Sequence, residues 1–280
     1  MTPTQLPPLR DVIAEHGLAA KKGLGQHFLL DLNLTRKIAR LTGAAKGDHI
    51  LEIGPGPGGL TRALLETEAD LTTIERDARI APILEDLAAA YPGQLSMVET
   101  DALAYDEQKI VDQRTTYIAS NLPYNISTEL LVKWLTVTPR WWQRMVLMFQ
   151  REVADRILAA PGSKTYGRLS VIAQAASRPS LGFHLPARAF TPPPKVDSSV
   201  VVFDTLEVDP IRIAALEKVT AAAFGQRRKM IRASLKPLFG EAVLKDALDH
   251  IGLEETLRAE TLSVDQFLQL ADALMAARKA

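Results

Sequence analysis

The glycine-rich segment at residues 51–61, Leu-Glu-Ile-Gly-Pro-Gly-Pro-Gly-Gly-Leu-Thr, constrains the fold of this chain more than any other feature. A short apolar run over residues 49–53 ends at the first glycine, and a helical pattern begins at Gly59. A strand, a tight turn and a helix in this order form the first unit of a βαβ fold. Glycine suits such a turn because it adopts positive φ and lets a ligand approach the bare backbone. We therefore predict a ligand-binding turn in a parallel sheet.

The spacing of these glycines also matches the fingerprint of dinucleotide-binding folds. Gly54, Gly56 and Gly59 supply the Gly-x-Gly-x-x-Gly pattern, and Glu75 ends the next predicted strand, where such proteins hold a ribose hydroxyl. A nicotinamide-dependent oxidoreductase is therefore one candidate function. A structural turn that binds no ligand is another interpretation, because short motifs often match by chance.

Two details of the segment favour a cationic nucleoside over a pyrophosphate. Pro55 and Pro57 have no N–H, so the turn offers few donors to a phosphate. Glu52 stands just before the first glycine, and its negative charge suits a cation better than a phosphate. S-adenosyl-L-methionine, a sulfonium attached to adenosine, meets both conditions, and we expect it to be the ligand.

The composition narrows the chemistry and the kind of partner. The chain has 280 residues, and its 33 basic and 33 acidic side chains cancel, so an RNA or DNA site must be a local patch. It has no cysteine, which excludes disulfides, thiolate zinc sites, iron–sulfur clusters and cysteine nucleophiles. The histidines lack metal-ligand spacing, and we predict no metal site. No stretch has the pattern of a signal peptide or a membrane span, so we expect a cytoplasmic protein without membrane contact.

The order of predicted elements divides the chain into three regions. Residues 1–24 form a polar N-terminal arm with one short helical pattern. Residues 25–207 alternate strands and helices, which predicts an α/β domain with a mainly parallel, Rossmann-like sheet. Residues 208–280 show helical patterns and predict a small all-helical C-terminal domain. The predicted strands are residues 49–53, 70–75, 95–99, 115–120 and 144–149, followed by two later β runs at 181–185 and 199–204.

Polar side chains stand at the ends of four successive predicted strands. These are Glu52 beside Gly54, then Glu75, Asp101 and Asn121. Ligands of parallel sheets bind at the carboxyl ends of the strands, so we expect these side chains to surround one site.

The segment Asn121-Leu122-Pro123-Tyr124 predicts the chemistry of that site. The lone pair of an exocyclic amine on a base is delocalised, which makes the amine hard to methylate. The Asn121 amide oxygen and a main-chain carbonyl near Pro123 can each accept one N–H, which places the nitrogen in line with a methyl donor. Tyr124 offers a flat face on which a flipped-out base can stack. An ordinary turn that uses Asn and Pro for backbone reasons is the simpler alternative.

Seven motifs of this chain occur in the same order in a known family. The set resembles the bacterial small-subunit ribosomal RNA adenine dimethyltransferases, the KsgA/RsmA family, from about Lys21 to the C-terminal region. The motifs are residues 25–29 (Gly-Gln-His-Phe-Leu), 52–61, 74–77 (Ile-Glu-Arg-Asp), 100–102 (Thr-Asp-Ala), 121–127, 166–170 (Tyr-Gly-Arg-Leu-Ser) and 190–198.

The resemblance implies a fold, a reaction and a partner. The fold would be that of a class I S-adenosylmethionine-dependent methyltransferase with a helical C-terminal domain. The enzyme would place two methyl groups on the amino nitrogen of each of two adjacent adenines near the 3′ end of 16S rRNA. Its partner would be the small ribosomal subunit, whose biogenesis it would serve. We expect a monomer that uses no metal.

The resemblance also implies roles for individual residues. His27 and Leu29 would close over the methionine part of the donor, Glu75 would hold its ribose and Asp101 would bond its adenine. The full set of expected donor-binding residues is His27, Leu29, Glu52, Gly54, Gly56, Glu75, Asp101 and Asn121. Asn121 and Pro123 would position the target amine, and Tyr124 and Phe190 would sandwich the target base.

One position departs from the family pattern. The usual residue at position 27 in the family is Asn, and this chain has His27. Imidazole can still donate to a carboxylate, so we expect donor binding to survive. A charged His27 would make that binding pH-dependent.

A basic segment in the C-terminal region is the candidate contact with RNA. Residues 224–236 predict a helix stopped by Pro237, with Ile231 and Leu235 on an apolar line. A solvated helix face is the simpler interpretation, but no acid interrupts the cations, which favours phosphate contact. The expected RNA-binding residues are Arg227, Arg228, Lys229, Arg232 and Lys236.

Two further interpretations of the whole chain stay open at this point. A close variant of the enzyme acts on large-subunit rRNA, and the shared loop motifs do not exclude it. The chain could also be a non-catalytic ribosome-assembly factor with a vestigial donor site. The intact set of Glu75, Asp101, Asn121 and Tyr124 argues against a vestigial site.

Overall fold

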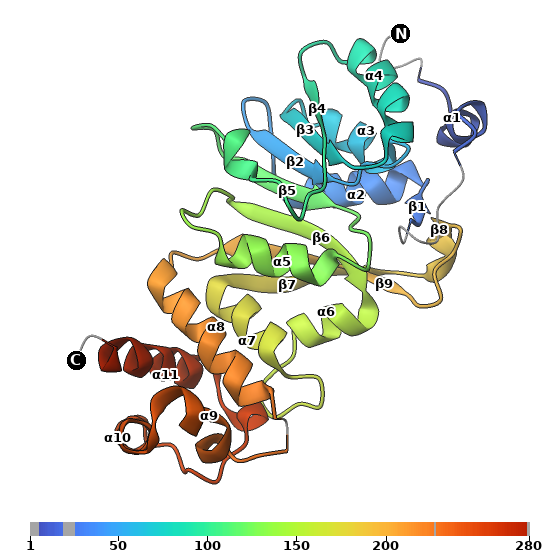
Figure 1. The fold of residues 1–280 in the computed structure, drawn as a ribbon. Helices are drawn as coiled ribbons and strands as arrows, with labels where there is room; N and C mark the ends of the chain where they lie inside the picture. The colour runs from blue at the N-terminus through green and yellow to red at the C-terminus, as the bar shows by residue number, and fades with distance from the viewer. Residues whose placement is uncertain (1–5, 19–25, 227, 279–280) are drawn as a thin grey trace. The chain divides into compact units, whose positions relative to one another are not determined.

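The computed structural model describes residues 6–18, 26–226 and 228–278, and Figure 1 shows its fold. The chain divides into two compact units. The first lies within Met1–Leu131, Trp141–Ala154 and Ser180–Asp204, and the second within Val132–Arg140, Asp155–Pro179 and Thr205–Ala280. The second unit therefore combines the helical region predicted from residue 208 with two segments from the middle of the chain. The predicted division into a catalytic and an RNA-binding domain stays a prediction.

A seven-stranded sheet in the order β4-β3-β2-β5-β6-β9-β7 organises the first unit. Strands β4, β3, β2, β5 and β6 pair in parallel, and β9 runs antiparallel to β6. This arrangement confirms the predicted α/β class and the five predicted parallel strands. The strands are β2 (His49–Ile53), β3 (Asp70–Glu75), β4 (Leu95–Glu99), β5 (Thr116–Ser120), β6 (Arg144–Gln150), β7 (Ser177–Leu185) and β9 (Ser198–Thr205).

Strand β2 lies near the centre of the sheet, and all five of its residues are buried. A parallel strand covered on both faces needs such a continuous run rather than an alternating pattern. Its main chain pairs with β3 over its whole length and with β5 over its first three residues. The turn after β2 therefore starts from a fixed point among three parallel strands.

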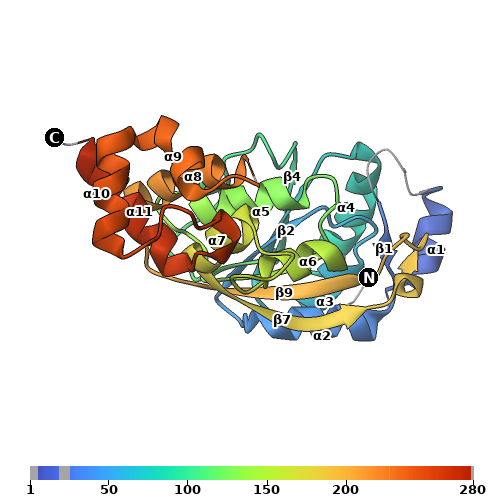
Figure 2. The ribbon, with the colours of Figure 1, turned by 90° about the horizontal axis from the view of Figure 1, so that it is seen from below.

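Helices α2 (Leu32–Thr42) and α3 (Gly59–Leu65) cover one face of this sheet (Figure 2). The side chain of Asp31 caps α2 by accepting the N–H of Asn33, and Gly43 ends the helix in the left-handed conformation. Ile38 and Ala39 of α2 pack in one core cluster with residues of β2, β3, β5, β6 and β9. The other helical elements that begin in this unit are α1 (Leu9–Glu15), η3 (Ala78–Ile80), α4 (Ala81–Ala90), η4 (Glu107–Lys109), α5 (Ser127–Thr136), α6 (Arg151–Ile157) and η5 (Ala187–Ala189).

The described part of the N-terminal arm packs on the first unit. Val12 of α1 is buried in a cluster with Phe28 and with Ile83 and Leu87 of α4. The guanidinium of Arg62, itself buried, donates to the carbonyl of Pro7 at 2.6 Å. The predicted polar arm therefore includes an apolar helix face that belongs to the core.

A two-stranded sheet that the sequence patterns did not predict joins two distant segments. Strand β1 (Phe28–Leu29) pairs antiparallel with β8 (Phe190–Thr191). The carbonyl of Leu29 lies against the first turn of α3, where a Cβ on Gly59 would be 2.4 Å from that oxygen. Glycine at position 59 therefore lets β1 lie directly on the start of α3.

The second unit is helical in its C-terminal part, as predicted. Helix α8 packs against α7 and α11, and the Arg212 guanidinium on α8 pairs with Asp272 on α11 at 2.7 and 2.8 Å. Asp209 caps α8, and Ser263 caps α11 through a capping box with Gln266. The elements are α7 (Arg168–Ala176), α8 (Pro210–Phe224), α9 (Ile231–Phe239), α10 (Glu241–Ile251), η6 (Ala259–Thr261) and α11 (Val264–Ala277).

The predicted helix over residues 224–236 is wrong before Ile231 and confirmed from there on. Helix α8 ends at Phe224, and α9 begins only at Ile231, because Met230 is extended and forms a β-bridge with Arg258. Pro237 lies inside α9 instead of ending it. A proline removes one intrahelical hydrogen bond, which a helix that ends within a turn can tolerate. Ile231 and Leu235 are fully buried, as the apolar line predicts.

None of the helices in the described ranges is both long enough and apolar enough to cross a membrane.

The close approach of β1 to α3 predicts the effect of Gly59→Ala. Alanine normally favours a helix over glycine, but here its Cβ would clash with the Leu29 carbonyl. We expect a loss of about 1–3 kcal/mol in the free energy of unfolding, the usual cost of overpacking. Urea unfolding of Gly59→Ala and of Gly167→Ala, whose Cβ would meet no atom within 4 Å, provides the measurement and its control. Equal stabilities of the two variants would contradict the close approach.

Candidate functional site

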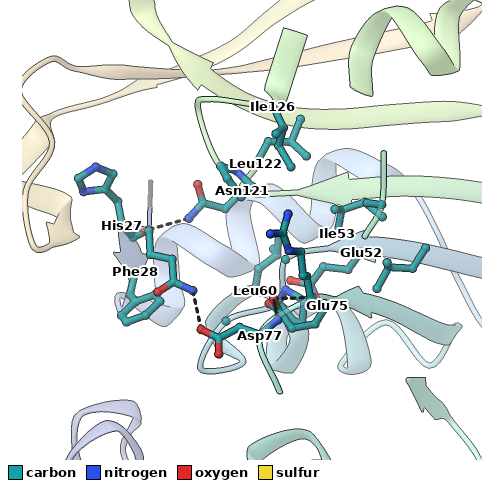
Figure 3. Close-up of a pocket in the computed structure, with 18 of the residues that line it drawn as sticks. His27, Phe28, Glu52, Ile53, Leu60, Glu75, Asp77, Asn121, Leu122 and Ile126 are labelled. Atoms are coloured by element: carbon teal, nitrogen blue, oxygen red, sulfur yellow. Dashed lines mark hydrogen bonds between the residues drawn. The ribbon is translucent and has the colours of Figure 1, made fainter. Parts of the chain in front are cut away.

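A cavity of about 370 Å³ lies in the first unit at the carboxyl ends of β2, β3, β4 and β5 (Figure 3). The parallel register sets these strand ends side by side, with Ile53 opposite Ile74 and Glu75 opposite Glu99. The structure brings ten of the predicted site residues to the wall of this cavity. They are His27, Leu29, Glu52, Gly54, Gly56, Glu75, Asp101, Asn121, Pro123 and Tyr124.

Glu52 is the most deeply buried acid of this wall, with an exposed fraction of 1%. The Thr61 hydroxyl at the start of α3 donates to its carboxyl group at 2.7 Å. Burial raises the pKa of Glu52 to about 8, although the Thr61 hydrogen bond acts in the opposite direction. The negative charge expected from the sequence is therefore absent at neutral pH in this structure. A cation beside this carboxyl would lower its pKa and restore the charge.

Glu75 ends β3, and its carboxyl group is held by the backbone that follows. One carboxyl oxygen accepts the N–H groups of Arg76 and Asp77, each at 2.8 Å. Burial raises the pKa of Glu75, while the N–H groups of Asp77, Arg76 and Gly56 lower it. The turn thus fixes the carboxyl group toward the cavity with donors that no side-chain rotation can remove.

Two basic residues without a predicted role, Arg76 and Arg79, lie beside the acids of this wall. Arg76 donates to Asp101 at 2.9 Å, and the other carboxyl oxygen of Asp101 accepts the N–H of Leu103. Arg79 binds Asp77, and this hydrogen bond is the main reason why the pKa of Asp77 falls to about 2. Both residues follow directly after the strand that ends in Glu75, and Arg76 belongs to the motif at residues 74–77.

Asn121 follows β5, and its amide is oriented by the main chain directly before β1. Its Nδ2 group donates to the carbonyl of His27 at 3.0 Å. A carbonyl only accepts, so the amide nitrogen must face His27 and the amide oxygen faces away from it (Figure 3). The structure therefore leaves the Asn121 Oδ1 atom on the other side of the amide, as an acceptor for an amine.

Tyr124 stands three residues further on and is fixed through its hydroxyl. This group and the Ser198 hydroxyl at the start of β9 are 2.6 Å apart. Burial raises the pKa of Tyr124. The ring lies beside His27, with centroids 5.6 Å apart and planes tilted by 30°. In the same turn, the carbonyl of Pro123 already accepts the N–H of Ile126 at 3.1 Å.

The structure does not bring Phe190 to the cavity. Its side chain is only 3% exposed and packs in the core cluster with Leu29 and Leu185. A benzyl group gains more from this apolar cluster than from the edge of a polar cavity. Its contact with a target base stays a prediction, and that contact would require the side chain to leave the core.

The predicted RNA-binding residues lie in the second unit. Arg228 and Lys229 are exposed on the turn before α9, and Arg227 falls outside the described residues. Arg232 faces Glu255 at 3.8 Å and Lys236 faces Glu241 at 2.8 Å. Such exposed pairs contribute little to stability, so phosphate groups can replace these acids at little cost.

In the described ranges, no cluster of three or more histidine, aspartate or glutamate side chains could hold a metal ion. The cavity offers carboxyl groups, an amide oxygen and aromatic faces. This combination suits a nucleoside with hydroxyl and amino groups to be bonded.

Solved structures define the class to which this fold belongs. A dimethyladenosine transferase from Plasmodium falciparum matches with a TM-score of 0.75 at 25% identity, over 87% of this chain and 96% of that one. The 23S rRNA methyltransferase ErmE has the same fold, with a TM-score of 0.68 at 24% identity over 89% of this chain and 99% of that one. The fold is that of the RNA methyltransferases with an α/β catalytic sheet.

The sequence places the chain within this class. The family model for ribosomal RNA adenine dimethylase matches residues 17–276, and the chain belongs to that family. Ribosomal RNA small subunit methyltransferase A from Sinorhizobium medicae is 56% identical over 274 residues, covering 96% of this chain and 98% of that protein. The protein of the same name from Phenylobacterium zucineum is 54% identical over 277 residues, covering 98% of this chain and 95% of the relative.

The burial of Glu52 predicts how stability depends on pH. Folded Glu52 keeps its proton up to about pH 8, whereas an ordinary glutamate loses it near 4.5. The unfolded chain therefore binds fewer protons in this window. The free energy of unfolding should fall as pH rises from 4.5 to 8, by roughly 5 kcal/mol in total from this residue.

Glu52→Gln tests this assignment, because the amide has no proton to lose. We expect a flatter dependence of stability on pH than in the wild type, and a more stable variant at pH 8. Urea unfolding at pH 5, 6, 7 and 8 gives both curves. Parallel curves would show that Glu52 is ionised throughout this range in the folded protein.

Proposed function

We propose that this protein transfers methyl groups from S-adenosyl-L-methionine to the exocyclic amino nitrogens of two adjacent adenines near the 3′ end of 16S rRNA. Membership of the adenine dimethylase family and the relatives named for the small subunit support this proposal. The observation that carries it is the orientation of Asn121, whose amide oxygen is left to accept an amine. The enzyme would act as a monomer in the cytoplasm, on small subunits during their biogenesis.

The residues of the cavity fit this donor. S-adenosyl-L-methionine, when bound, supplies a methyl group activated by a sulfonium charge. Glu75 is held in place to accept ribose hydroxyls, and Asp101 carries an acceptor for an adenine amine. Glu52 gains its charge when a cation lies next to it, so it favours a cationic ligand over a neutral one. Pro55 and Pro57 line the turn where a dinucleotide would need N–H donors.

The chain's own groups position the target amine. Asn121 Oδ1 accepts one N–H and draws the nitrogen toward the donor end of the cavity. Because the His27 carbonyl holds the amide, the Asn121 side chain is already oriented before the transfer and does not have to reorganise during it. No strong base is needed, because the methylated ammonium is acidic and releases its proton readily. Tyr124, fixed by Ser198, offers the face on which the flipped base stacks.

Methyl transfer to isolated ribosomal subunits tests this function. The protein is incubated with labelled S-adenosyl-L-methionine and with unmethylated small subunits or large subunits, and the label is mapped. We expect label on the amino nitrogens of two adjacent adenines of 16S rRNA. Label on 23S rRNA alone would show that the large subunit, and not the small one, is the substrate. Binding of NAD without any response to S-adenosyl-L-methionine would overturn the whole proposal.

Asn121→Ala should lower the transfer rate by roughly a hundredfold, the usual effect of losing one positioning group in a water-poor site. Asn33→Ala makes the same change on the exposed face of α2, away from the cavity, and should retain wild-type transfer. Single-turnover kinetics of both variants give the rates, and circular dichroism checks their folding. A folded Asn121→Ala enzyme with near-normal turnover would show that this amide does not position the amine.

The basic turn before α9 is the proposed contact with rRNA phosphates. Arg228→Glu with Lys229→Glu should weaken binding to the small subunit and flatten its salt dependence by roughly 0.7–0.9 per lost contact. S-adenosyl-L-methionine affinity should not change, because both residues lie outside the unit that forms the cavity.

The matched control places the same charge change elsewhere on the second unit. Lys218→Glu with Lys245→Glu reverses two exposed cations on α8 and α10. Subunit binding is measured for both double variants at several salt concentrations. Equal slopes and affinities for the two would place the RNA contact outside this turn.

A further inference from the structure

We infer that His27 is a positioning residue for the target base. Its side chain holds the segment 192–198 against the Asn121–Tyr124 turn. This inference rests on the proposed function, because it assigns a role within the same reaction. The resemblance implies a place for His27 over the donor. The imidazole, however, is turned away from Glu75 and Asp77 (Figure 3).

The imidazole makes its hydrogen bond to the chain that follows β8. His27 Nδ1 lies 2.8 Å from the carbonyl oxygen of Pro192. The carbonyl can only accept, so Nδ1 must carry the proton in this contact. The bond extends the β1–β8 pairing by one side-chain link, at the point where the chain leaves β8.

The other end of this segment is fixed to Tyr124. Ser198 shares a hydrogen bond with the Tyr124 hydroxyl, and the Tyr124 ring contacts the His27 ring. Between the two ends, Asp197 accepts the N–H of Arg151 with its main chain and the N–H of Ala187 with its side chain. His27, segment 192–198 and Tyr124 therefore form a closed ring of contacts beside the Asn121 amide.

The same residue orients the acceptor of the target amine. The His27 carbonyl receives the Asn121 amide N–H, while the His27 side chain fixes Pro192 and the Tyr124 ring. His27 therefore contacts both the amide that would hold the target amine and the ring on which the base would stack. A base that enters this site meets a surface already assembled, which reduces the entropy lost on binding.

Three substitutions separate the two functions of the side chain. His27→Asn places an amide nitrogen close to the position of Nδ1 and keeps the bond to Pro192 without the ring. His27→Phe keeps a ring beside Tyr124 and removes the donor. His27→Ala removes both. None of the three substitutions removes the main-chain hydrogen bonds between β1 and β8 or the His27 carbonyl that accepts the Asn121 N–H.

A matched control exists in the same unit. His184 is exposed on β7, and its Nδ1 is 2.9 Å from the Ser199 hydroxyl, yet it does not line the cavity. His184→Phe therefore removes the same kind of bond elsewhere and should behave as the wild type.

The test compares subunit methylation with donor binding. We expect His27→Phe and His27→Ala to raise KM for small subunits by about tenfold, the size of one lost hydrogen bond, while S-adenosyl-L-methionine affinity changes by less than about threefold. His27→Asn should restore KM to near the wild-type value.

Three results would overturn the inference. The first is a wild-type KM in folded His27→Phe. The second is a donor affinity that falls in step with turnover, which would place the imidazole on the donor side. The third is a His27→Asn enzyme with a KM as high as that of His27→Ala, because the hydrogen bond to Pro192 would then make no contribution to KM. A wild-type protein that does not methylate small subunits would instead overturn the proposed function.

Discussion

Parallel pairing on both edges of β2 is the constraint on which the site depends. Because β3 and β5 run in the same direction as β2, their last residues emerge at one edge of the sheet. Glu52, Glu75 and Asn121 are separated by many residues in sequence, yet this pairing alone places them around one cavity. The full burial of β2 makes the register hard to change, because a shift by one residue would exchange the side chains of its two packed faces.

Charge in this cavity is controlled by burial more than by the number of acids. Glu52 has a raised pKa because burial removes the solvent that would stabilise its charge, and the Thr61 hydroxyl offsets this only in part. Glu75 has a raised pKa for the same reason, and only backbone N–H groups oppose it. Asp77, with Arg79 beside it, stays ionised to about pH 2. The acids of this wall thus differ in pKa. A cation would interact most strongly with the buried carboxyl groups of Glu52 and Glu75, where solvent screens its charge least.

Long, periodic elements could be predicted from the sequence, and short contacts between distant segments could not. The five parallel strands and the polar residues at their ends follow from apolar runs and glycine positions. Strands β1 and β8 have only two residues each, too few for any pattern. The break before α9 depends on a bridge between Met230 and Arg258, a tertiary contact that overrides a good helical pattern. The burial of Phe190 likewise depends on its neighbours in space, Leu29 and Leu185.

The unpredicted two-stranded sheet connects the two sides of the proposed transfer site through one short segment, residues 27–29. Its Leu29 carbonyl rests on Gly59 at the start of α3, which ties β1 to the turn after β2. The carbonyl of His27, directly before β1, accepts the Asn121 amide N–H. The pairing of β1 with β8 leads into segment 192–198, whose Ser198 hydroxyl hydrogen-bonds the Tyr124 hydroxyl. Movement of β1 would therefore disturb the proposed donor side and the proposed base side together. An enzyme that must align a methyl group with an amine gains from this arrangement, because a misplacement of about 1 Å already costs much of the rate.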